Sequence, residues 1–117
     1  MATLKHQLSD FLKVDGINAA VLVGRDGFVI EGISNDGRDV ETVGAVISTG
    51  LGTSEMVGKE LNVGGLTQSM VEYDKGILLM GTIGKDALLC VVCDTGANLG
   101  NARLQLKKRT PELAAEL

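Results

Sequence analysis

The chain has 117 residues and a formal net charge of −4 at pH 7, and only 3% of its residues are aromatic. A chain of this length is expected to fold as a single domain over residues 1–117. The acidic balance and the shortage of aromatic side chains argue against a nucleic-acid partner, which would need basic and stacking surfaces. Without an apolar stretch of membrane-helix length or an apolar signal core at the N-terminus, the sequence predicts a cytoplasmic protein with no membrane partner.

Apolar residues make up 44% of the chain, and the mean hydropathy is +0.21. A small domain leaves much of its surface exposed, so this apolar fraction implies either an unusually hydrophobic surface or a surface that another subunit covers. We favour the second interpretation, which predicts a homodimer.

Hydrophobic periodicity and turn signals predict four elements in the first half of the chain. Asp26-Gly27 between two apolar runs is typical of a hairpin turn. Asp39 stands where it can cap the longest helix. The four elements are a helix over 3–12, strands over 17–24 and 28–33, and a helix over 40–61.

The second half predicts three strands and a final helix. Residues 87–93 form one unbroken apolar run, as a strand buried on both faces requires. Asn98 can cap the final helix, and Pro111 is expected to prevent its continuation, although residues 110–112 can start a short further turn. The elements are strands over 66–73, 77–83 and 87–93, and a helix from 99 to about 109.

The predicted order is therefore α-β-β-α-β-β-β-α, in which a long helix joins a hairpin to a three-stranded meander. Two antiparallel units joined in this way indicate an α+β sandwich rather than a doubly wound sheet.

Two stretches resemble the roadblock/dynein light chain family. The motif D-x-x-A-N-L-G at residues 94–100, between an apolar strand and a basic amphipathic helix, is similar to the family's C-terminal signature. Residues 14–30 resemble its opening hairpin, and the resemblance covers essentially the whole chain. It implies a roadblock-like, profilin-like fold: a five-stranded, mostly antiparallel sheet with one helix on one face and two on the other.

Known members of the family are small non-catalytic dimers that scaffold or regulate Ras-like GTPases and motor complexes. The chain resembles in particular the bacterial or archaeal partners of Mgl-type GTPases. The resemblance thus implies a non-catalytic homodimeric scaffold or regulator of a Ras-like small GTPase. An assembly subunit of a motor or other multiprotein complex is the alternative, and a small-molecule or redox sensor is a further one.

The redox alternative depends on Cys90 and Cys93, which match C-x-x-C. Both lie inside a predicted strand, where positions three apart point to opposite faces. They are therefore expected to be buried apolar side chains that neither form a disulfide nor share a metal ion.

No other constellation in the sequence supports catalysis. Gly52 and Gly58 are separated by five residues rather than the four of a phosphate-binding loop, and Glu60 stands where Ser or Thr must hold magnesium. His6 is the only histidine, and no Cys, Asp or Glu is placed to join it. We therefore predict no catalytic residue, no cofactor and no metal ion, and the chain is not expected to be an enzyme.

The long helix carries the predicted interface. Gly44, Ser48 and Gly52 are four residues apart and form a row of small side chains beside an apolar stripe. The row either packs on the protein's own sheet or lets a partner helix approach closely; the apolar excess favours the partner. The resemblance implies dimerisation through this helix and the edge strand 66–73. The predicted interface residues are Val40, Val43, Gly44, Ile47, Ser48, Leu51, Gly52, Glu55, Leu66, Gln68, Met70 and Glu72.

Overall fold

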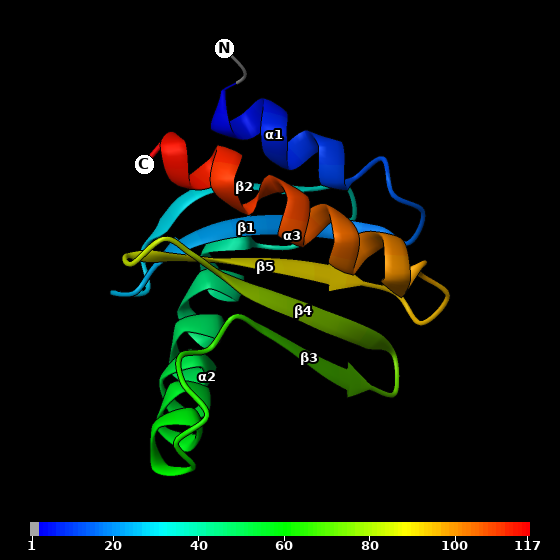
Figure 1. The fold of residues 1–117 in the computed structure, drawn as a ribbon. Coiled ribbons are helices and arrows are strands. Elements are labelled where there is room, and N and C mark those ends of the chain that lie inside the picture. The colour runs from blue at the N-terminus through cyan, green and yellow to red at the C-terminus, as the bar shows by residue number, and fades with distance from the viewer. Residues whose placement is uncertain (1–2) are drawn as a thin grey trace.

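The computed structural model describes residues 3–117, and its elements follow the predicted order (Figure 1). Each predicted helix and strand is present, with shifts of a few residues at the ends. The elements are α1 (Leu4–Phe11), β1 (Ile17–Gly24), β2 (Val29–Ser34), α2 (Val40–Glu60), β3 (Gln68–Tyr73), β4 (Gly76–Ile83), β5 (Ala87–Cys93) and α3 (Leu99–Ala115).

The five strands form one sheet in the order β2-β1-β5-β4-β3. All four neighbouring pairs are antiparallel, so the sheet is wholly rather than mostly antiparallel. Every residue of the central strand β5 is buried, as its unbroken apolar run predicted. Strands β2 and β3 form the two edges.

Two apolar cores lie on opposite faces of this sheet. Leu8 and Phe11 of α1 and Leu106 of α3 fill one face, and Ile47 and Leu51 of α2 fill the other. Figure 1 shows α1 and α3 together on one side and α2 on the other. The predicted α+β sandwich, with one helix on one face and two on the other, is thus confirmed.

Local signals set most element boundaries. The Asp39 carboxylate accepts a hydrogen bond from the backbone N–H of Glu41 at 3.1 Å, and Asn98 caps α3 in the same way through the N–H of Asn101. In the β1–β2 turn, Gly27 adopts a φ of 91°, a conformation that favours glycine.

No helix within residues 3–117 is long and apolar enough to cross a membrane.

The C-terminal boundary differs from the prediction. Helix α3 continues through Pro111 to Ala115, so the helix end predicted near Arg109 is wrong. Proline has no N–H to donate within a helix, which costs about 3 kcal/mol in a helix interior. The continuation buries Leu113 completely, and full burial of a leucine stabilises by about 1.5–3 kcal/mol. Tertiary packing therefore offsets the local penalty of the proline.

Replacement of Leu113 by alanine is expected to lower the free energy of unfolding by about 2–5 kcal/mol, because it opens a cavity in the core under α1 and α3. Urea denaturation measures the loss. Leu104→Ala, on the exposed side of the same helix, is the matched control and should change stability little. Equal stability of the two variants would mean that the last turn of α3 does not dock.

Candidate protein-interaction surface

Helix α2 extends beyond the sheet that it covers (Figure 1). Its first half packs on the sheet, where Gly44, Ile47 and Leu51 are buried. Its opposite side and its C-terminal half leave large apolar side chains in solvent, among them Val46 at 65% and Met56 at 64% exposure. An exposed apolar helix face of this kind marks a candidate interaction surface.

The predicted row of small residues, Gly44, Ser48 and Gly52, is partly packed against the protein's own sheet and partly exposed to solvent. A Cβ on Gly44 would lie 2.6 Å from Cγ2 of Val29, so this glycine lets α2 pack closely on the β1–β2 hairpin. Ser48 is half-buried beside the turn at Gly27. A Cβ on Gly52 would have no neighbour within 4 Å. The same row thus begins on the protein's own sheet and ends in open space.

Two adjacent hollows lie between α2 and the part of the sheet that α2 does not cover. Their volumes are about 390 and 210 Å³, and they share Val46, Ile47 and Leu78 in their walls. We call them together the α2 groove. Its walls are mainly apolar; they comprise Arg38, Thr42, Val43, Val46, Ile47, Gly50, Thr53, Ser54, Val71, Tyr73, Leu78, Met80 and Val92.

The edge strand β3 contributes to both faces of the sheet. Val71 and Tyr73 line the α2 groove, whereas Gln68 lines a hollow beside α3. Because side chains alternate along a strand, Met70 and Glu72 point to the same side as Gln68. The predicted interface residues of β3 therefore lie on the face of the sheet opposite to α2. They meet the predicted interface residues of α2 only at the unpaired edge of β3.

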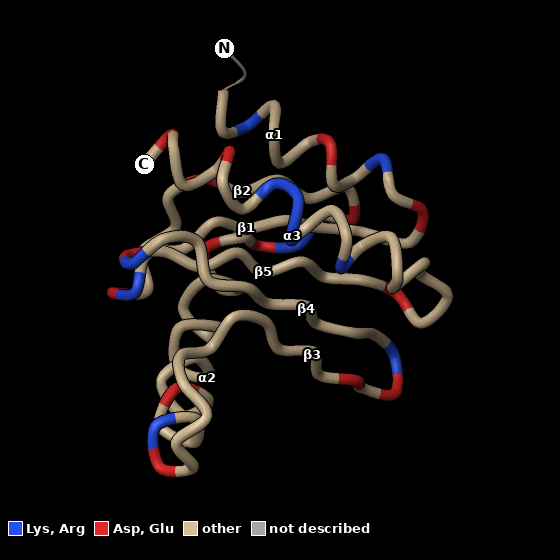
Figure 2. The backbone as a smooth tube through the Cα atoms, viewed as in Figure 1, with Lys and Arg blue, Asp and Glu red and all other residues tan. Residues whose placement is uncertain are grey.

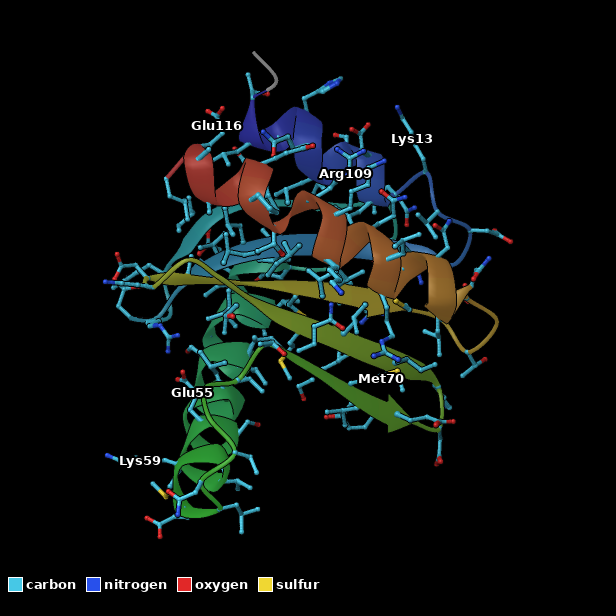
Figure 3. The ribbon with its side chains drawn as sticks, in the orientation of Figure 1. Lys13, Glu55, Lys59, Met70, Arg109 and Glu116 are labelled. Atoms are coloured by element: carbon cyan, nitrogen blue, oxygen red, sulfur yellow. The ribbon has the colours of Figure 1, made fainter. Side chains whose placement is uncertain are left out.

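Three further predicted interface residues, Leu66, Val40 and Glu55, make contacts within the protomer. Leu66 and Val40 are half-buried against the core under α2. Glu55, labelled on α2 in Figure 3, pairs with Arg25 at 2.5 Å. Arg25 also donates from Nε to the backbone oxygen of Lys85 at 2.6 Å. Arg25 therefore ties the middle of α2 to the β4–β5 turn. This tether was not predicted, since nothing in the local sequence relates these three segments.

The two cysteines lie on opposite faces of the sheet, as predicted. Cys90 belongs to the core under α2 and Cys93 to the core under α1 and α3. Burial raises the pKa of the Cys90 thiol to about 12, and burial, together with the Asp94 carboxylate, raises the pKa of Cys93. No group of three or more His, Cys, Asp or Glu residues within 3–117 is arranged to hold a metal ion.

Comparison with known proteins identifies the class of domain that has this fold. The profile of the Roadblock/LC7 domain matches residues 3–93, and the chain belongs to this family. An uncharacterized protein of Methanocaldococcus jannaschii is 34% identical over 108 residues, which cover 92% of this chain and 94% of the relative.

Solved structures agree on the fold. The Roadblock/LC7 domain from Streptomyces avermitilis has a TM-score of 0.89 at 21% identity, with 97% of each chain covered. MglB of Myxococcus xanthus has a TM-score of 0.86 at 20% identity, with 95% of this chain and 91% of that chain covered. Profilin IA of Acanthamoeba castellanii, at 0.54 and 14% identity over 94% and 92% of the two chains, supports the profilin-like description.

Both thiols are expected to react slowly with a disulfide reagent at mildly alkaline pH. The reaction needs an accessible thiolate, and the raised pKa values keep these buried groups protonated. The colour that the reagent releases should report two reactive thiols per chain only when denaturant unfolds the protein. Free cysteine is the control. One fast thiol in the native protein would contradict this and favour a redox sensor.

Proposed function

We propose that this chain is a non-catalytic homodimeric scaffold or regulator of a Ras-like small GTPase. The α2 groove is the observation that carries the proposal, because it is a mainly apolar surface left uncovered within one protomer. Membership of the Roadblock/LC7 family and similarity in fold to MglB support the same function.

In the proposed dimer, the α2 helices of two copies pack against each other. Four exposed residues of α2 follow the spacing of one helix face: Val46, Thr49, Gly50 and Thr53. Three of the four are small, which permits close approach of a second helix. The unpaired edge of β3 lies beside the α2 groove and offers backbone hydrogen bonds to the same partner.

A regulator of this kind acts by binding rather than by chemistry. It can hold the switch loops of a GTPase in one arrangement, which is an order–disorder effect that needs no catalytic group. The sequence contains four arginines that could be considered for an arginine finger, Arg25, Arg38, Arg103 and Arg109, but turn or helix-end roles suffice for all four. Three of them are in ion pairs: Arg25 with Glu55, Arg38 with Asp36, and Arg109 with Asp10.

We expect sedimentation at micromolar concentration to give about twice the chain mass of 12.2 kDa. Val46→Lys should shift the protein toward monomer, because it places a charge in the middle of the apolar α2 groove. Thermal unfolding should show that the exposed substitution leaves the protomer folded.

Leu104→Lys is the matched control, since it introduces the same charge at an exposed leucine on the opposite face of the sheet. It should remain dimeric. A wild-type monomer, or a Val46→Lys variant that stays as dimeric as the control, would contradict the proposed interface.

The chain is expected to bind a small GTPase of its organism in a nucleotide-dependent manner and to hydrolyse no GTP alone. A pull-down compares the GTPase loaded with a non-hydrolysable GTP analogue and with GDP, and Val46→Lys tests whether binding needs the dimer. Equal binding to both forms would favour the assembly-subunit alternative. Binding to no small GTPase of the organism would contradict the proposed function.

A further inference from the structure

A second groove lies on the other face of the sheet, between α3 and the strands β3 and β4. Helix α3 runs across β5 and β4 and leaves β3 without a helix above it (Figure 1). The space that remains has a volume of about 670 Å³. We call it the α3 groove; its walls include Thr67, Gln68, Thr82, Arg103, Leu106 and Lys107.

The floor of the α3 groove is closed by tight packing. A Cβ on Gly81 of β4 would lie 3.0 Å from Cδ2 of Leu106, so the glycine lets α3 approach the sheet at this point. Leu106 is itself buried, so the accessible apolar surface comes from Pro111 in the groove and from Leu104 in the wall of an adjoining hollow. The groove thus combines an apolar floor with hydroxyl and amide groups that can meet a peptide backbone.

The charge of the α3 groove is opposite to that of the whole protein. Arg103 and Lys107 are one helical turn apart and line the groove, and no acidic side chain lies in its walls. Neither residue has an ion-pair partner within residues 3–117, whereas Arg25, Arg38 and Arg109 all do. Figure 2 shows the basic stretches of α3 in blue. Two unpaired cations therefore face an open groove in a chain of net charge −4.

We propose that the α3 groove binds an extended acidic segment of a partner protein in which acidic and apolar residues alternate. Carboxylates would pair with Arg103 and Lys107, and apolar side chains would cover the exposed Pro111 and Leu104. The segment is expected to lie near Gln68 rather than farther along β3, because Glu72, on the same side of the strand and about 13 Å away, would repel its carboxylates. This site is separate from the α2 groove and does not depend on the proposed GTPase function.

The probe is a short fluorescein-labelled peptide in which Glu and Leu alternate, and fluorescence anisotropy measures its binding to the intact protein. We expect saturable binding that weakens as salt rises, since exposed charge pairs are screened. Arg103→Glu/Lys107→Glu should weaken binding by at least about tenfold, because two attractive pairs become repulsive. Backbone amide signals of Thr67, Gln68 and Gly81 should shift on binding.

The matched control is Lys5→Glu/Lys108→Glu, which makes the same change in net charge at exposed lysines outside the groove. It should change the affinity by less than about twofold. Thermal unfolding confirms that both variants fold.

Equal weakening in the two variants would mean a general charge effect and overturn the proposal, as would the absence of binding up to millimolar peptide. Binding to vesicles containing phosphatidylserine without binding to the peptide would assign the groove to a membrane surface instead. Displacement of the peptide by inorganic phosphate at equal concentration would assign it to a phosphate group. Each result would overturn the acidic-segment proposal.

Discussion

The central strand β5 imposes the main constraint on this structure. Its seven residues are all buried, and it pairs with β1 on one side and β4 on the other. A strand that is apolar on both faces needs cover on both faces, so helices must lie on each side of the sheet. Within residues 3–117, three helices serve the two faces of the five-stranded sheet: α1 and α2 contact β1 and β2, and α3 contacts β4. The parts of the sheet that stay open are consequences of this arrangement.

The open parts lie at the same edge of the sheet but differ in chemistry. On one face α2 packs mainly on β1 and β2, which leaves the mainly apolar α2 groove above β3 and β4. On the other face α3 packs on β4 and leaves the α3 groove, where Arg103 and Lys107 are unpaired. An apolar surface suits a partner that stays bound through buried area, whereas exposed cations suit a partner chosen by charge. The two grooves are therefore suited to different partners.

The sequence predicts this fold well where the signals are local. The unbroken apolar run of β5, the Asp26-Gly27 turn and the capping side chain of Asn98 each act within a few residues, and each is confirmed. The prediction failed at Pro111, where the decisive contact is the burial of Leu113 by residues distant in sequence. Likewise, the spacing of small residues on α2 is visible in the sequence, but which of them pack on the sheet depends on how far α2 extends beyond it.

The glycines of α2 connect the fold to the proposed dimer. Each glycine in a helix interior costs about 1 kcal/mol relative to alanine. The cost of Gly44 is offset within the protomer, because Val29 occupies the space that a side chain would need. Gly50, on the exposed face proposed for the dimer, has no such neighbour: nothing lies within 4 Å of a Cβ built at this position. Its cost has no offset of this kind in one copy of the chain, so close approach by a second helix is the contact that would balance it.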